Sequence, residues 1–146
     1  MNKKTILFIE DNKDDFLVSV KALKESNVLL NYLIVAFDGI EAKKELMLDE
    51  KSDFKKLKFY PNLIILDLGL PYVGGMEILK KIKKNDYIKN VPVVVFTSSD
   101  NEEDLLKCYE LGVNSFVKKP DSYEEFMHVV QKIAEYWLEV NLTITK

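Results

Sequence analysis

The segment PNLIILDLGLP, residues 61–71, is an apolar run that ends in a single carboxylate, Asp67. Residues 63–66 are apolar at every position, which is typical of a strand covered on both faces within a parallel sheet. Ligands of α/β sheets bind in the crevice beyond the carboxyl ends of such strands. The pattern therefore predicts a central strand with Asp67 at the ligand-binding edge. Aspartate before glycine and proline is also common in turns, so this residue alone does not establish a functional site.

Three further apolar runs also end in polar side chains. These are Thr5–Ile9 before Glu10 and Asp11, Val91–Phe96 before Thr97 and Ser98, and Ser115–Val117 before Lys118, Lys119 and Pro120. In a parallel sheet these ends share one edge, which would bring carboxylates, a hydroxyl and an ammonium together.

With these residues the chain resembles the receiver domain of two-component response regulators, over about Lys4 to Trp137. In that family an acidic pair after the first strand, here Glu10 and Asp11, helps to hold Mg²⁺. The aspartate that ends the third strand, here Asp67, accepts a phosphoryl group. The resemblance therefore implies a phosphoacceptor with a divalent cation, Mg²⁺ or in its place Mn²⁺.

The resemblance assigns further residues to this site. Thr97 matches the family's switch hydroxyl and Phe116 its switch aromatic side chain, while Lys119 matches the lysine that directly precedes a proline. The backbone carbonyl of Gly69 matches the third protein ligand of the metal. The resemblance also implies a cis Lys119–Pro120 bond.

Five strands alternating with five helices indicate a doubly wound α/β fold, and the resemblance implies the flavodoxin-like strand order 2-1-3-4-5. The remaining strand is expected at 32–36. Helices are expected at about 14–26, 40–48, 76–84 and 122–138, with another between a capping Asp100 and Gly112. We expect one domain over residues 1–146, with a core at about 4–138 and a C-terminal tail at 139–146.

Composition argues against several classes of protein. The net charge is −3 and all 21 basic residues are lysine, so neither a basic surface nor an arginine that reads guanine favours nucleic-acid binding. The sequence contains neither a long apolar run for a membrane span nor a signal-peptide pattern, and we expect a cytoplasmic protein. Cys108 is expected to pack in a helix, His128 to have a surface or packing role, and the lysines of 80–84 to lie mainly on a solvated helix face.

The function most consistent with these residues is a stand-alone response regulator, a signalling protein and not an enzyme. It would take a phosphoryl group from a histidine kinase or phosphotransfer protein. A flavodoxin-type cofactor binder is disfavoured because the acidic residues 10–15 would repel a flavin phosphate. An aspartate-based phosphohydrolase is disfavoured because Gly69 stands where such enzymes carry a second aspartate. The remaining alternative is a receiver fold that acts only as a phosphorylation-independent interaction module.

Charge repulsion gives an independent reason to expect a cation. Glu10, Asp11 and Asp67 close together would repel one another unless one is protonated or a divalent cation neutralises them.

Within the receiver family, the chain is most similar to the small phytochrome-associated response regulators. The features that carry this similarity are the acidic pair followed by Asn12, a lysine-rich segment before the third strand and the Tyr-Trp-Leu run at 136–138.

Two apolar stripes exceed what the core requires. In the first helix Val18 and Ala22 supply an inward face, while Phe16, Val20 and Leu23 form a second stripe. The kinase or phosphotransfer protein is therefore expected to dock near Phe16 and Val20.

At the end of the chain the surplus apolar residues are Tyr136, Trp137, Val140, Leu142 and Ile144. They predict a homodimer through the last helix and tail; the alternative is a tail that folds back onto its own domain.

Overall fold

The computed structural model describes residues 4–48 and 57–144. Most of the lysine-rich segment at 51–58 lies outside the described residues. In the order of the chain the elements are β1 Thr5–Ile9, α1 Lys13–Lys24, β2 Tyr32–Ala36, α2 Gly39–Glu45, β3 Leu63–Leu66, α3 Gly75–Lys84, β4 Val93–Thr97, α4 Glu102–Glu110, β5 Ser115–Lys118 and α5 Tyr123–Glu135. A π-helical turn at Tyr136–Val140 extends α5.

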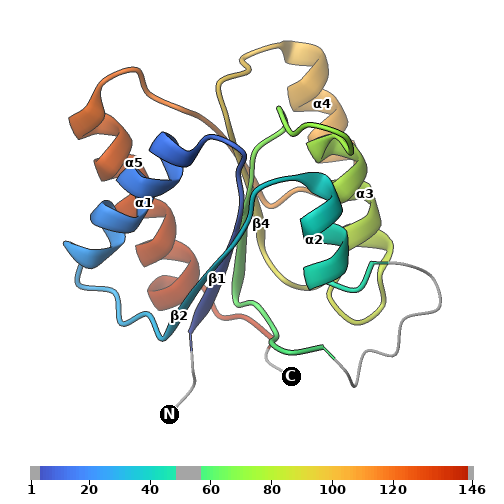
Figure 1. The fold of residues 1–146 in the computed structure, drawn as a ribbon, viewed down its shortest axis with the longest axis horizontal. Helices are drawn as coiled ribbons and strands as arrows, with labels where there is room; N and C mark the ends of the chain where they lie inside the picture. Colours follow the sequence, from blue (N-terminus) through green and yellow to red (C-terminus); the bar gives the residue numbers. More distant parts are fainter. Residues whose placement is uncertain (1–3, 49–56, 145–146) are drawn as a thin grey trace.

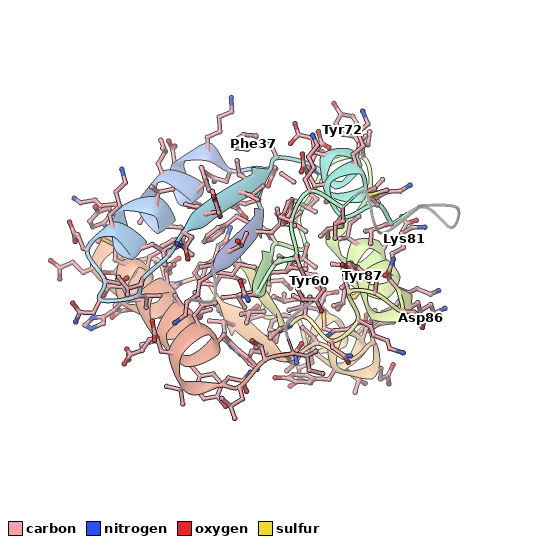
Figure 2. All side chains as sticks on the ribbon, turned by 90° about the horizontal axis from the view of Figure 1, so that it is seen from below. Phe37, Tyr60, Tyr72, Lys81, Asp86 and Tyr87 are labelled. Carbon is pink, nitrogen blue, oxygen red and sulfur yellow. The ribbon has the colours of Figure 1, made fainter. Side chains whose placement is uncertain are left out.

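The five strands form one parallel sheet in the order β2-β1-β3-β4-β5, as predicted. Helices α1 and α5 cover one face of the sheet, and α2, α3 and α4 cover the other (Figure 1), and the same two layers are seen from below with their side chains in Figure 2. The strand order reverses between β1 and β3, so the carboxyl ends of these two strands border the crevice where a ligand is expected.

The central strand β3 is buried on both faces, which explains why its sequence does not alternate. Leu63 and Ile65 belong to the apolar cluster beneath α1 and α5, whereas Ile64 and Leu66 belong to the cluster beneath α2, α3 and α4. Successive side chains of a strand point to opposite faces, and each face here meets a helical layer. Asp67 follows at the first position beyond the strand.

Helix starts differ from the predictions because neighbouring asparagines act as caps. The Asn12 side chain accepts a hydrogen bond from the Asp15 N–H at 3.0 Å, so α1 begins at Lys13. The predicted Asp100 cap of α4 is wrong. Asn101 accepts the Glu103 N–H at 2.8 Å, while Asp100 is bound to Lys118 at 2.9 Å. An ion pair thus takes the carboxylate that could have capped the helix.

The structure also tests what was expected of Cys108, of His128 and of the lysines at 80–84. Cys108 is buried with its sulfur 3.6 Å from that of Met76, and burial raises the pKa of its thiol to about 11, which agrees with a packing role. His128 is exposed on α5. Lys83 departs from the solvated face, because it is half-buried and its Nζ donates to Asn114 Oδ1 at 2.8 Å.

None of the helices in the described ranges is long and apolar enough to cross a membrane. The cytoplasmic location stays a prediction.

Candidate functional site

Backbone hydrogen bonds continue the sheet by one residue beyond the strands and so place the polar side chains. The Glu10 N–H donates to Ala36 O at 3.0 Å, the Asp67 N–H to Ile9 O at 2.9 Å, and the Lys119 N–H to Thr97 O at 2.7 Å. These residues are held as firmly as strand residues and lie together at the carboxyl edge. Thr97 ends β4 between them and is buried.

The ammonium of Lys119 is the centre of the site. Its Nζ lies 2.7 Å from Glu10 Oε1, 2.9 Å from Asp67 Oδ2 and 2.8 Å from Asp15 Oδ2. Glu10, Asp67 and Lys119 are all less than a tenth exposed. Hydrogen bonds of this kind to an ammonium offset part of the cost of burying charged groups.

The buried carboxylates differ in their protonation. Burial, reinforced by the neighbouring Asp67, raises the pKa of Glu10 to about 8. Burial acts on Asp67 in the same direction, but hydrogen bonds with Glu10, Lys119 and the Gly69 N–H lower the pKa of Asp67 below its ordinary value. Of the two carboxyl groups, Glu10 is therefore the one that takes up a proton more readily and Asp67 the one that ionises more readily. An ionised carboxylate is the form that can act as a nucleophile.

The same edge offers ligands for a divalent cation. Glu10, Asp11 and Asp67 can each present a carboxylate oxygen within 4.8 Å of the others, and Asp11 is exposed whereas the other two are buried. An all-oxygen, negatively charged set reached from solvent fits a hard cation such as Mg²⁺ or Mn²⁺. The donor chemistry thus agrees with the cation predicted from the sequence.

Three other predicted residues lie around this cluster. The Gly69 N–H donates to Asp67 Oδ1 at 3.0 Å, which orients the carboxylate. Thr97 Oγ1 accepts the Ser99 N–H at 3.4 Å. Phe116 is half-buried on β5 against the apolar cluster beneath α2, α3 and α4.

The predicted cis Lys119–Pro120 bond is wrong, because no peptide bond among the described residues is cis. With a trans bond the lysine amine still reaches Glu10 and Asp67. Most X–Pro bonds in folded proteins are trans, and this bond follows that general preference instead of the cis form that the resemblance implied.

Asp15 is the member of the site that sequence reasoning missed. The first helix was expected at about 14–26, within and beyond the acidic residues 10–15, and Asp15 had no expected role in the site. The available signal was an acidic first turn directly after the acidic pair, but this signal does not distinguish Asp15 from Asp14. Only the structure shows that Asp15 meets Lys119 whereas Asp14 is exposed.

Comparison with known proteins identifies the family that has this fold and this kind of site. The chain belongs to the response regulator receiver domain family, whose sequence pattern matches residues 6–131. Response regulators of this family are signalling proteins of two-component systems.

The chain is similar to small response regulators, one of which is a cyanobacterial phytochrome response regulator. The response regulator Rcp1 of Synechocystis is 39% identical over 136 residues, which cover 93% of this chain and 90% of that protein. The crystal structure of the phosphorylated cyanobacterial phytochrome response regulator RcpA superimposes with a TM-score of 0.89 at 33% identity, covering 99% of this chain and 100% of that one. The Mn²⁺-bound form of Rcp1 gives a TM-score of 0.85 at 37% identity, covering 97% and 99%.

Proposed function

We propose that this protein receives a phosphoryl group on Asp67, with a divalent cation, and thereby switches its interactions with other proteins. The observation that carries the proposal is the position of Asp67. Its carboxylate is buried, is bound to Lys119 at 2.9 Å and belongs to the cation-binding set with Glu10 and Asp11. The relatives support it as well, since the RcpA structure is of a phosphorylated protein and that of Rcp1 contains Mn²⁺.

The chemistry is a phosphoryl transfer. An oxygen of the ionised Asp67 attacks phosphorus, and the bond from phosphorus to the donor's imidazole nitrogen breaks as that nitrogen keeps the electron pair. The products are an acyl phosphate and a neutral imidazole, whose other ring nitrogen carries the proton. Lys119 reduces the repulsion between the carboxylate and the incoming anion, and the Thr97 hydroxyl donates a hydrogen bond to a phosphoryl oxygen.

The side chains of Glu10, Asp11 and Asp67 and the backbone carbonyl of Gly69 would hold the cation. When bound, Mg²⁺ or Mn²⁺ neutralises charge on the carboxylates and on the phosphoryl group.

The phosphoryl donor is a sensor histidine kinase or a phosphotransfer protein that docks near Phe16 and Val20. Phe16 packs edge-on against Phe8 and Phe37, so much of its ring contributes to the fold. Leu17 on the same helix is 62% exposed and provides apolar surface beside these two residues. A docked partner there would approach the carboxyl edge from the side of α1.

A phosphate-affinity gel tests the proposed function. Protein treated with acetyl phosphate and Mg²⁺ should show a shifted band, which EDTA or the substitution Asp67→Asn should abolish. A normal shift in EDTA, or one that persists in Asp67→Asn, would contradict the site. A protein that is never labelled but still binds its partner would instead be a phosphorylation-independent interaction module.

A further inference from the structure

The three amine protons of Lys119 face three carboxylates, but only two of these belong to the cation-binding set. Glu10 and Asp67 are members of that set, whereas Asp15 is not. Asp15 Oδ2 nevertheless lies as close to Lys119 Nζ as the other two, at 2.8 Å. Lys119 thus has one carboxylate partner, Asp15, that would not bind the cation.

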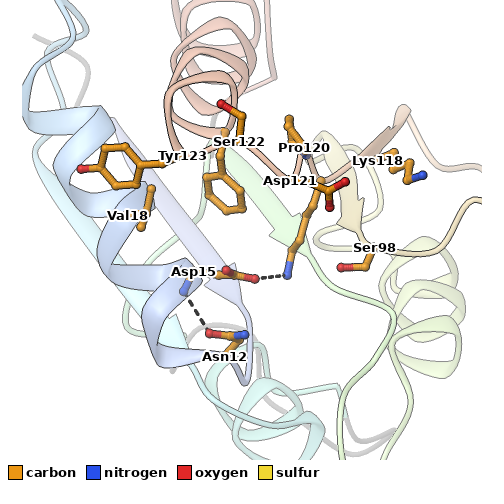
Figure 3. A pocket seen from close by; sticks show the side chains of 11 residues that line it. Asn12, Asp15, Val18, Ser98, Lys118, Pro120, Asp121, Ser122 and Tyr123 are labelled. Atoms are coloured by element: carbon orange, nitrogen blue, oxygen red, sulfur yellow. Dashed lines mark hydrogen bonds and ion pairs between the residues drawn. The ribbon is translucent and has the colours of Figure 1, made fainter.

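The backbone of Asp15 is fixed in the first turn of α1. Its N–H donates to Asn12 Oδ1 at 3.0 Å and its carbonyl accepts from Ser19 Oγ at 2.8 Å. In Figure 3 a dashed line marks the contact of the Asp15 carboxylate with an amine nitrogen, which is the Nζ of Lys119. Asp15 and Lys119 both line a pocket of about 420 Å³. The Asp15 side chain is 30% exposed, compared with 10% for that of Asp67, so Asp15 lies on the solvent-facing side of the cluster.

A cation changes which partners Lys119 keeps. A bound cation would compete with Lys119 for the oxygens of Glu10 and Asp67, and phosphorylation would move the negative charge of Asp67 from its carboxyl group to the phosphoryl oxygens. Lysine has a flexible four-carbon stem, so an ammonium that loses some of its fixed partners is held less firmly in position. Asp15 belongs neither to the cation-binding set nor to the proposed phosphorylation site, so neither event would occupy its carboxylate.

We infer that Asp15 is a positioning residue, which holds the Lys119 ammonium beside Asp67 when the cation occupies the carboxylates. Its role in phosphoryl transfer rests on the proposed function. The contact between Asp15 and Lys119 in the cation-bound protein does not, and it can be tested separately.

The contact is tested by a double-mutant cycle of Asp15→Ala and Lys119→Ala on urea unfolding in saturating Mn²⁺. Contacting charged pairs are coupled, and we expect a coupling of about fivefold or more in the unfolding equilibrium constant. Asp14→Ala is the matched control, because Asp14 carries the same charge in the same helical turn but is exposed. Its cycle with Lys119→Ala should show a coupling of less than about twofold. Equal coupling in the two cycles would overturn the inference.

The second measurement uses only the conservative variants Asp15→Asn and Asp14→Asn, and so does not depend on the folding of Lys119→Ala. Loss of one charge-assisted hydrogen bond should slow labelling by acetyl phosphate about tenfold in Asp15→Asn but leave Asp14→Asn near wild type. The Mn²⁺ affinity of Asp15→Asn, from calorimetry, should stay within about threefold of wild type.

Equal labelling rates in the two variants, or an Mn²⁺ affinity that falls by the same factor as the rate, would show that Asp15 does not act through Lys119. If wild-type protein is not labelled at all, the proposed function fails, while the unfolding cycle still decides whether Asp15 holds Lys119.

Discussion

Two adjacent glycines, Gly74 at the N-cap and Gly75 at the first position of α3, differ sharply in their surroundings. A Cβ atom on Gly75 would lie 2.3 Å from the carbonyl oxygen of Asp67 and 2.6 Å from the Cα of Leu68, whereas one on Gly74 would meet nothing within 4 Å. The start of α3 thus lies directly against the backbone that carries Asp67. Only Gly75 is required for this close approach.

We therefore expect Gly75→Ala to lower the free energy of unfolding by about 1–3 kcal/mol and to displace Asp67, because backbone atoms cannot yield as a flexible side chain can. Gly74→Ala should stay within about 0.5 kcal/mol of wild type, as surface substitutions usually do. Urea unfolding of both variants measures the difference. A Gly75→Ala protein as stable as Gly74→Ala would show that the approach of α3 to Asp67 is not this close.

Lys83 is a half-buried base whose ionisation should affect stability. Burial lowers the pKa of Lys83 to about 8. Below that pH the folded protein contains a charged, partly desolvated amine, while between about 8 and 10.4 the folded form loses the proton and the unfolded form keeps it. Since the unfolded state then binds more protons, Lys83 makes the free energy of unfolding rise with pH across this interval.

The expected gain from pH 7 to pH 10 is about 1–3 kcal/mol relative to the variant Lys83→Met, in which this position does not titrate. Denaturant titrations of both proteins at the two pH values provide the measurement. Parallel pH profiles for wild type and Lys83→Met would mean that the amine is solvated in the folded protein.

At the scale of elements, β4 and β5 connect the site to the surface. Val95 pairs with Phe116 and Thr97 with Lys118 in the parallel register, so Thr97 and Phe116 lie on neighbouring strands. A phosphoryl group that draws the Thr97 hydroxyl toward it would vacate space that the Phe116 ring can enter. Phe116 has no hydroxyl, so packing alone would decide between an outward and an inward position of its ring.

We accordingly predict that beryllofluoride, a phosphoryl mimic, moves the Phe116 ring inward in wild-type protein but not in Thr97→Ala. Crystal structures of each protein with and without the mimic test this coupling. An unchanged ring in wild type, or an inward ring in Thr97→Ala, would contradict it.

At the scale of the whole molecule, the end of the chain presents apolar surface that its own domain does not cover. Leu142 is 97% exposed, and Val140 and Ile144 are exposed as well, which argues against a tail folded back onto the domain. Trp137 is half-buried against the core beneath α1 and α5, so it serves the fold and is a poor probe of assembly. Covering a few such side chains at a symmetric contact, at roughly 1.5–3 kcal/mol each, could support a dimer.

The predicted homodimer is tested by light scattering across micromolar concentrations, with and without beryllofluoride. Leu142→Ser should shift the protein toward the monomer, whereas Leu29→Ser, at an exposed leucine before β2, should not. Wild type that is monomeric throughout, or a Leu142→Ser protein that associates unchanged, would refute the dimer.

Much of the fold and of the site could be predicted from the chain itself. Uninterrupted apolar runs such as Leu63–Leu66 mark strands buried on both faces, because burial determines which side chains a strand can carry. The polar residue that ends each run then lies at the carboxyl edge, because all strands of a parallel sheet end their runs on that side. Glu10, Asp67 and Lys119 were found by this argument, together with the resemblance to receivers.

The sequence could not determine which polar side chains from distant parts of the chain contact one another. Asp15 and Lys119 are 104 positions apart, and nothing local distinguishes Asp15 from Asp14. Likewise, a lysine such as Lys83 looks solvated in a helical pattern until packing places its amine beside Asn114. Local patterns show which face of an element is buried, but only the packing of elements determines which charge meets which.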